Sequence, residues 1–425
     1  MNLIILSVYS PSILGVILEN MIDKIINLVN LEKAYLEVVD RFLADRKNLN
    51  YHGLDGFFLR DYDLDSRQLL LACQRELLIG QVVDPALLIK IPKKNKPDNF
   101  RNIFIYNIKE RIKAQAIYRI ILPDLESRFS DRLFSYRPGR PPHLAAKQFC
   151  RNYRRVFLKS QAVVIDLKNY SEQINQSILI GQLERVFDDH KVIDLLKLFI
   201  GNQICHQGVI NKLDRGLVQG VPLIALFANL YLSDLDFKYQ HKINFYVRVG
   251  DDIALLDDRV DHLIKIKDEF FNDLLALDLS PNDHKIYCGP ATGSYSFLGY
   301  QFNNGQISLE SGFIDKIIAN WKQILSEQHL GQKQKYNLIK RKMDQLVTNY
   351  NYQFDKLLAD KPQINDYQQI RWLTDKFFII MTKFFYQTYS PRYRRLVTKQ
   401  LKRLGIKSPY QIYWQFHHGK SRTTS

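Results

Sequence analysis

Three aspartates stand out because each interrupts or ends an apolar run. Asp251 and Asp252 lie side by side within the largely apolar stretch 245–256, and Asp166 follows the apolar run 161–165. Adjacent carboxylates repel one another, and a carboxylate at the end of a buried strand is costly unless it is paired or bound to a cation. Three carboxylates brought together would suit a divalent cation such as Mg²⁺, which prefers oxygen ligands. Taken alone, the Asp-Asp pair could equally be a solvated turn.

The runs around these aspartates predict the strands that would position them. Residues 245–249 and 253–256 are β-branched, aromatic or aliphatic apart from one arginine, which predicts a β-hairpin with the carboxylates at its tip. Gly250 favours a tight turn there because glycine tolerates positive φ. Residues 161–168 predict another strand, and the apolar spacing over 174–186 predicts a helix after it.

Composition points to a polyanionic partner. The 425 residues predict two or three domains, and 46% hydrophobic residues are ample for packed cores. Lys and Arg number 60 against 44 Asp and Glu, which gives a net charge of +16. Such a balance favours nucleic acid or an anionic membrane surface as the partner. A membrane role is disfavoured because no segment combines a strong apolar face with Trp-rich anchoring.

Two features bear on the compartment. The four cysteines have no Cys-x-x-Cys spacing, so we expect reduced, buried thiols and a cytoplasmic location; they are Cys73, Cys150, Cys205 and Cys288. Residues 1–18 are apolar but lack a basic n-region, so neither a signal peptide nor a spanning helix fits well. Met21 opens a more ordinary amphipathic helix over 22–44, and one hypothesis is that translation starts there.

Further motifs, taken with the aspartates, resemble reverse transcriptases of the group II intron type. Five segments carry this resemblance, namely Ile-Pro-Lys-Lys-Asn-Lys-Pro at 91–97 with Arg101, Arg-Pro-Gly-Arg at 137–140, Gln-Gly-Val-Pro-Leu at 219–223, Val-Gly-Asp-Asp at 249–252 and Phe-Leu-Gly-Tyr at 297–300. The last of these resembles the primer-grip hairpin of the family. The resemblance implies an α+β fold of the right-hand polymerase class, with antiparallel sheets in fingers and palm and a helical thumb.

The same resemblance implies a division of the chain into domains. Those we expect are an N-terminal helical extension (1–50), fingers (51–160 with part of 170–215), a palm carrying the acids (161–305), and a helical thumb with a basic appendix (306–425). Helices are predicted over 222–239, 313–328, 333–350 and 367–388. The basic tail 399–407 could track a duplex backbone or simply be a solvated helix face.

The resemblance assigns roles to individual residues. Asp166 and Asp251, with Asp252 the less certain partner, would hold two Mg²⁺ ions, for which Mn²⁺ could substitute. Two divalent ions stabilise both the attacking and the leaving oxygen in nucleotidyl transfer. Lys285 would protonate the departing pyrophosphate.

On the nucleotide side, Arg101 would contact the triphosphate with help from Lys93. The alternative for both is a solvated basic turn. Gln219 could hydrogen-bond to sugar or base. Ser171 stands where the family places an aromatic against the 2′-position of the nucleotide, so we expect weaker rejection of ribonucleotides. Ser171 could instead be the N-cap of the following helix.

The implied activity is RNA-directed DNA polymerisation, in which dNTPs are added to a primer 3′-end. Partners would be an RNA template and a DNA or RNA primer, with a cognate structured RNA or defence-system proteins as further candidates, and no membrane. Two alternatives stay open: an untemplated or self-primed defence polymerase, and a maturase-like RNA-binding protein with little polymerase activity. Metal dependence and template dependence would separate the three.

Val249 and Gly250 depart from the usual Tyr-Ala before the Asp pair, which bears on activity.

Overall fold

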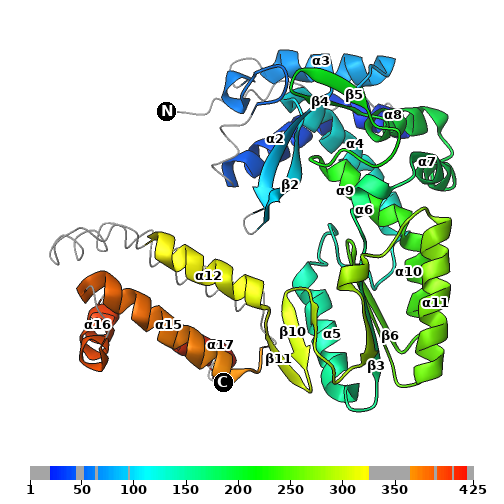
Figure 1. Cartoon of the computed structure of the whole chain (residues 1–425). Helices are drawn as coiled ribbons and strands as arrows, with labels where there is room; N and C mark the ends of the chain where they lie inside the picture. The colour runs from blue at the N-terminus through cyan, green and yellow to red at the C-terminus, as the bar shows by residue number, and fades with distance from the viewer. Residues whose placement is uncertain are drawn as a thin grey trace, which may run out of the picture. The chain divides into compact units, whose positions relative to one another are not determined.

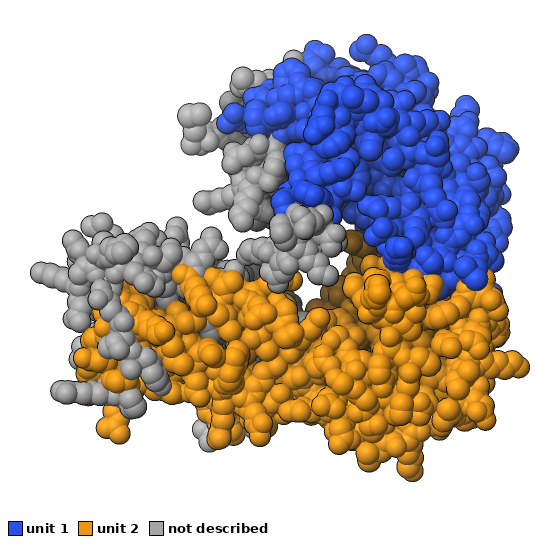
Figure 2. Space-filling model, in the orientation of Figure 1, with its two compact units in different colours: residues 1–130, 168–235, 273–280 blue, residues 131–167, 236–272, 281–425 orange. Residues whose placement is uncertain are grey.

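A computed structural model describes residues 20–44, 52–62, 66–93, 96–324, 364–386, 390–403 and 406–418. The chain folds into two compact units, coloured separately in Figure 2. Unit 1 comprises residues 1–130, 168–235 and 273–280, and unit 2 comprises 131–167, 236–272 and 281–425. Each unit is therefore assembled from segments far apart in the sequence. The predicted domain boundaries stay a prediction.

Unit 1 is built around one long buried helix, α4 (Ile108–Glu126), which packs against α2, α3 and α9. A sheet in the order β2-β1-β4-β5 adjoins it, and its β1–β4 pair is parallel while the other pairs are antiparallel. Its other elements are α1 (Met21–Ile26), α2 (Leu28–Ala44), η2 (Leu59–Tyr62), α3 (Ser66–Ile79), β1 (Ala86–Lys93), β2 (Lys96–Ile105), α6 (Tyr170–Gln173), α7 (Gln176–Glu184), α8 (His190–Ile200), β4 (Gln203–His206), β5 (Val209–Lys212) and α9 (Pro222–Tyr231) (Figure 1).

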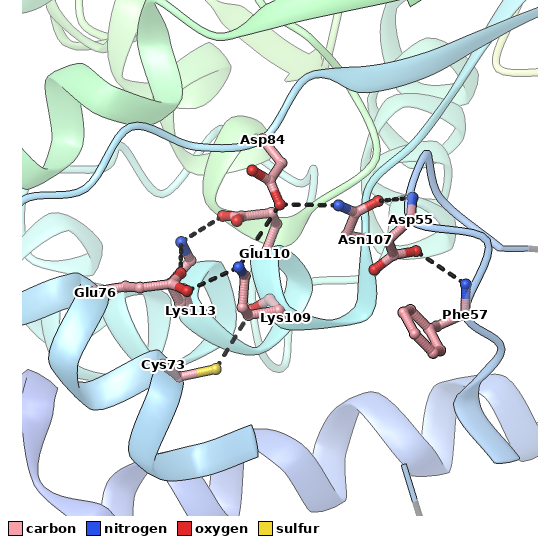
Figure 3. A network of polar contacts seen from close by, with 9 residues as sticks. All are labelled: Asp55, Phe57, Cys73, Glu76, Asp84, Asn107, Lys109, Glu110 and Lys113. Carbon is pink, nitrogen blue, oxygen red and sulfur yellow. Dashed lines mark hydrogen bonds and ion pairs between the residues drawn. The ribbon is translucent and has the colours of Figure 1, made fainter. Parts of the chain in front are cut away.

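Four charged side chains form a buried network between α3 and α4, hereafter the unit 1 ion network: Glu76, Lys109, Glu110 and Lys113 (Figure 3). The Lys113 ammonium lies 2.8 Å from carboxylate oxygens of both Glu76 and Glu110, and Lys109 lies 2.8 Å from Glu76. Each acid in the network has a lysine at ion-pair distance. Burial raises the pKa of Glu110. Burial also acts to raise the pKa of Glu76, but hydrogen bonds from Lys109 and Lys113 outweigh it, and the pKa of Glu76 is lowered.

Unit 2 contains a four-stranded antiparallel sheet in the order β6-β7-β3-β8 and a three-stranded sheet in the order β11-β10-β9. Helix α5 packs on one face of the larger sheet, where Phe149 contacts the core formed by alternate residues of β3, β6 and β7. The elements are α5 (Pro142–Val156), β3 (Gln161–Asp166), β6 (Phe245–Val249), β7 (Asp252–Asp257), η3 (Asp283–Lys285), β8 (Tyr287–Pro290), β9 (Tyr295–Phe297), β10 (Tyr300–Asn303), β11 (Gln306–Leu309), α12 (Ser311–Ile324), α15 (Tyr367–Tyr386), α16 (Pro391–Arg403) and α17 (Pro409–His418). Two helices, α10 (Ser233–Gln240) and α11 (Val260–Ala276), begin in one unit and end in the other.

The predicted primer-grip turn is present. Strands β9 and β10 pair in register at Phe297 and Tyr300, and the two residues between them both have positive φ, 49° at Leu298 and 75° at Gly299. Two residues in this conformation form the tight turn that matches strand twist. The strand pair therefore reverses direction within two residues, as the motif predicted.

Two predicted helices are interrupted. The helix expected over 22–44 breaks at Asn27, because its backbone is extended there and its side chain accepts a hydrogen bond from Val29 N–H at 2.9 Å, which starts α2. The helix expected over 222–239 is divided at Leu232 into α9 and α10. The helices expected over 313–328 and 367–388 are present as α12 and α15, while 333–350 lies outside the described residues.

The prediction of four buried thiols is wrong for one of them. All four cysteines are free, and Cys73, Cys150 and Cys205 are buried, but Cys288 in the edge strand β8 is exposed. Burial alternates along this strand, and Cys288 lies on its more exposed side. In the part of the chain that the structure describes, no helix combines the length and apolar character needed to cross a membrane.

Candidate active site

The predicted hairpin carries the two adjacent acids at its tip. Strands β6 and β7 pair antiparallel up to Val249 and Asp252, and Gly250 and Asp251 form the turn between them. Gly250 has φ +64°, and a Cβ atom there would meet no atom within 4 Å. Glycine is therefore favoured at this position by backbone conformation and not by space.

Strand β3 brings the third acid to the same edge of the sheet. Asp166 is the register partner of Asp252 in the β3–β7 pair, and the Leu167 N–H donates a hydrogen bond of 3.2 Å to the Asp251 carbonyl. The sheet thus gathers Asp166, Asp251 and Asp252, hereafter the acid cluster. Their common position follows from strand register, which no single motif specifies.

The acid cluster carries more negative charge than its surroundings neutralise. Burial, followed by the charges of Asp251 and Asp166, raises the pKa of Asp252 to about 7. Burial and the charge of Asp166 also raise the pKa of Asp251. The pKa of Lys285 is raised as well. Burial acts to lower it, but the hydrogen bond to Asp166 and the negative charge of Asp166 outweigh burial, so the ammonium form is favoured. The three carboxylates therefore share one nearby ammonium in an environment that favours added positive charge.

Asp166 is held at both carboxylate oxygens by a single short turn. The Lys285 ammonium lies 2.8 Å from Oδ2 of Asp166, and the Asn282 amide donates a hydrogen bond of 3.1 Å to Oδ1. The Asn282 N–H also donates to the Asp166 carbonyl at 2.8 Å. Asn282 precedes η3 and Lys285 ends it, so the turn presents both donors to one carboxylate. Lys285 was predicted at this site, whereas Asn282 was not.

A fully buried ion pair lies next to the Gly250–Asp251 turn. Arg248 donates to Asp236 from Nε at 2.8 Å and from Nη2 at 2.6 Å, and Tyr246 donates to the same carboxylate at 2.7 Å. Arg248 Nη1 also donates to the Gly250 carbonyl at 3.1 Å, which ties the pair to the turn. Sequence reasoning missed these residues, although an arginine inside an otherwise apolar strand was an available signal for a buried partner.

The donor set fits a hard divalent cation. Carboxylate oxygens without sulfur or imidazole are the ligands that Mg²⁺ and Mn²⁺ prefer, and mutual repulsion in the acid cluster favours a cation. Within the described ranges, no three His, Cys, Asp or Glu side chains are gathered as a ready-made metal site. In this structure the oxygens of Asp166 contact Lys285 and Asn282.

The residues predicted on the nucleotide side lie in unit 1. Arg101 is exposed on β2, opposite Ile91 of β1, in the hairpin that the basic motif predicted. The side chain of Lys93 lies outside the described residues. Gln219 Nε2 donates to the Ser171 hydroxyl at 2.5 Å, so these two predicted residues contact one another. Both are accessible to solvent to some degree, as a substrate contact requires.

The alternative role for Ser171 is wrong. Ser171 lies within α6, whose N-cap is Asn169, and the N-cap of the next helix is Asn175, which accepts hydrogen bonds from Ser177 and Ile178. The hydroxyl of Ser171 is instead the acceptor for Gln219. Its position is tied to β2 as well, because the adjacent Glu172 accepts a hydrogen bond of 3.1 Å from the amide of Asn102.

Comparison with known proteins agrees with this geometry. Residues 91–302 match the family described as reverse transcriptase (RNA-dependent DNA polymerase). The group II intron-encoded protein LtrA of Lactococcus lactis subsp. cremoris is 30% identical over 165 residues, which cover 38% of this chain and 26% of LtrA. The mitochondrial nuclear intron maturase 2 of Arabidopsis thaliana is 33% identical over 89 residues, 21% of this chain and 12% of the maturase. The matches thus span about a quarter or less of these relatives.

Among solved structures, telomerase from Candida albicans in complex with a fragment of telomeric RNA aligns over 80% of this chain and 67% of that chain, with 13% identity and a TM-score of 0.43. The family match confirms the predicted α+β fold of the right-hand polymerase class. It covers β3, the β6–β7 hairpin and the turn that holds Asp166. Through residues 91–302, this chain belongs to the reverse transcriptase (RNA-dependent DNA polymerase) family, with relatives of the group II intron type.

Proposed function

We propose that this chain is an RNA-directed DNA polymerase that extends a primer 3′-end with dNTPs, and that the acid cluster is its catalytic centre. The observation that carries the proposal is the meeting of Asp166, Asp251 and Asp252 at one sheet edge, with only part of their charge neutralised. Family membership supports the same reaction. A protein that only bound RNA would gain nothing from gathering three like charges at one place.

Residues of the acid cluster would hold two divalent cations, Mg²⁺ or Mn²⁺. When bound, such ions stabilise charge on the attacking and leaving oxygens of an in-line displacement. Asp166 ends β3, Asp251 lies in the turn between β6 and β7, and Asp252 begins β7. Arg248 and Asp236 keep this turn in place from behind. Lys285 would donate a proton to the departing pyrophosphate.

The unit 1 residues would bind the nucleotide. The guanidinium group of Arg101, which is always charged and can donate two parallel hydrogen bonds, would contact the triphosphate, with Lys93 assisting. Gln219 and Ser171 would lie against the sugar, where the small Ser171 side chain leaves room for a 2′-hydroxyl. The hydrogen bond between them supports a shared role, because it fixes the orientation of both side chains.

An RNA template and a DNA or RNA primer are the proposed partners, in keeping with the net charge of +16. The basic helix α16 would add phosphate contacts without sequence preference. We further propose a cytoplasmic location, where RNA and dNTPs are both available. A link to a bacterial defence system, with its own structured RNA or protein partners, belongs to the same proposal.

The test is primer extension on an RNA template of defined sequence, with Mg²⁺ and dNTPs. The native chain is compared with Asp251→Asn/Asp252→Asn, and Asp258→Asn is the matched control. Asp258 follows the opposite end of β7 and accepts a hydrogen bond from Asn244, which an asparagine there could still accept. Template-directed product that is lost in the double variant and kept in the control supports the proposal.

Other outcomes point to the alternatives. Product whose sequence ignores the template would indicate an untemplated or self-primed polymerase. Binding of RNA with no product from any variant, in Mg²⁺ or Mn²⁺, would overturn the proposal and favour a maturase-like binder.

A further inference from the structure

The contacts of Asp166 differ in kind at its two oxygens. At Oδ1 the partner is the neutral amide of Asn282, whose backbone also bonds the Asp166 carbonyl. At Oδ2 the partner is the charged ammonium of Lys285, at 2.8 Å. Asn282 thus makes two bonds to one residue from a rigid turn, whereas Lys285 reaches it with the end of a flexible side chain.

The ion pair with Lys285 contributes little to stability. The Lys285 side chain is 60% exposed and that of Asp166 is 19% exposed. Exposed ion pairs typically add little to stability, because water screens them and ordering a long side chain costs entropy. The pair is thus easily broken, and it lies on the carboxylate that the proposed function assigns to a cation.

A lysine and a divalent cation that share Oδ2 of Asp166 would repel one another. Mg²⁺ binds carboxylate oxygens at about 2.1 Å, so an ammonium held at the same oxygen would lie within strongly repulsive range of the ion. Lys285 has space to move, because it is largely exposed. The neutral Asn282 meets no such repulsion, and its bonds to Oδ1 and to the backbone can persist.

We propose that Lys285 is a removable counter-ion of Asp166: it neutralises the carboxylate until a divalent cation binds and then leaves, while Asn282 is a positioning residue that holds Asp166 in both states. This inference rests on the proposed function, since it concerns how the same acid cluster takes up its cations. Lys285 keeps its proton in the exchange, so no bond is made or broken beyond the ion pair. Once released, its ammonium is free to meet the pyrophosphate.

The experiment measures Mn²⁺ binding to the full chain without nucleic acid or nucleotide, by electron paramagnetic resonance of the free ion. Lys285→Met removes the competing charge and is expected to tighten Mn²⁺ binding about fivefold. Asn282→Ala leaves Asp166 loosely held and is expected to weaken binding about tenfold, as for other residues that orient a metal ligand. Lys242→Met is the control, because Lys242 pairs with Glu269 elsewhere in unit 2 and its loss removes the same charge.

The two variants are thus expected to shift the affinity in opposite directions. A purely structural role for the turn would lower the melting temperature of both variants without this opposition. Unchanged or weaker Mn²⁺ binding in Lys285→Met, or a tightening as large in Lys242→Met, would overturn the proposal.

The proposed function and the counter-ion inference can be tested independently of one another. If the native chain extends primers but Lys285→Met leaves Mn²⁺ affinity unchanged, only the counter-ion inference is wrong. If Asp251→Asn/Asp252→Asn binds Mn²⁺ as well as the native chain does and no variant extends a primer, the catalytic assignment of the acid cluster is wrong as well.

Discussion

Two groups of charge, one in each unit, differ in how they are neutralised. In the unit 1 ion network, each glutamate has a lysine at 2.8 Å, and the Lys113 side chain between them is only 2% exposed; Lys109 also lies 3.7 Å from Asp84 (Figure 3). In the acid cluster of unit 2, the one lysine contacts Asp166, and its side chain is 60% exposed. The raised pKa values of Asp251 and Asp252 show that these two carboxylates favour a further cation.

This difference separates a structural role from the catalytic role that we propose for the acid cluster. A buried acid costs free energy unless its charge is matched, so a fold retains a poorly matched group only where a ligand supplies the missing charge. Substitutions in the two groups should therefore have opposite consequences. Loss of a charge in the unit 1 ion network should destabilise the fold. Loss of a charge in the acid cluster should abolish activity without destabilising the fold.

The largest expected effect is on the activity of the acid cluster. Asp251→Asn/Asp252→Asn should lower primer extension more than a thousandfold, because the cation ligands are lost. The melting temperature should stay the same or rise, since the substitution removes repulsion between neighbouring carboxylates. Extension assays and a thermal melt on the same preparation check both parts. A sharp loss of melting temperature would show that these acids support the fold, which breaks the comparison.

The second effect is on stability in unit 1. Lys113→Met should lower the free energy of unfolding by about 3–5 kcal/mol, because it leaves Glu110 buried beside a weakened network. Urea unfolding measures the loss, and activity per folded molecule should not change. The double variant Lys113→Met/Glu110→Gln should recover most of the lost stability. If it does not, the methionine itself packs badly and the charge argument fails.

The hydrogen-bonded pair of Ser171 and Gln219 carries no charge, so we expect a substitution there to have a smaller effect than those in the two charged groups. Ser171→Phe should raise discrimination against ribonucleotides about tenfold, because the larger side chain fills space near the sugar and displaces Gln219. Single-nucleotide incorporation with dNTP and NTP measures the ratio. Ser177→Phe, on the exposed face of α7, is the matched control. An unchanged ratio in Ser171→Phe, or native discrimination already as strict as in relatives with an aromatic, would contradict this assignment.

The smallest effect belongs to an exposed ion cluster in unit 2. Hydrogen bonds from Lys242 and Lys238 lower the pKa of Glu269, so folding favours its charged form. Glu269→Gln should lower stability by under about 1 kcal/mol at neutral pH. Because the folded pKa lies below the unfolded one, this difference should be present above about pH 5 and vanish as the pH falls through the folded pKa. Melting curves of both proteins from pH 7 to pH 3 test it; a difference that persists at low pH would be due to packing.

The acid cluster shows how far sequence reasoning reaches. The hairpin over 245–256 was predictable because Gly250 between two apolar runs specifies a tight turn locally, and the strand 161–166 was predictable from its apolar run. The break at Asn27 was not, because a single side-chain hydrogen bond to Val29 overrides an amphipathic pattern that continues on both sides. Exposure of Cys288 was also missed, since cysteine is usually buried but an edge strand leaves one side open.

The sequence by itself determined the residue types and the local structure: three acids at strand ends, a glycine turn, and motifs that resemble reverse transcriptases. Only the tertiary structure decided the partnerships. Strand register places Asp166 opposite Asp252, and the fold brings Asn282 and Lys285 to Asp166 and Asp236 to Arg248. The physical reason is the short range of local preferences, because turn and strand propensities act over a few neighbouring residues. Charge neutralisation instead depends on atoms that meet only when distant segments pack together.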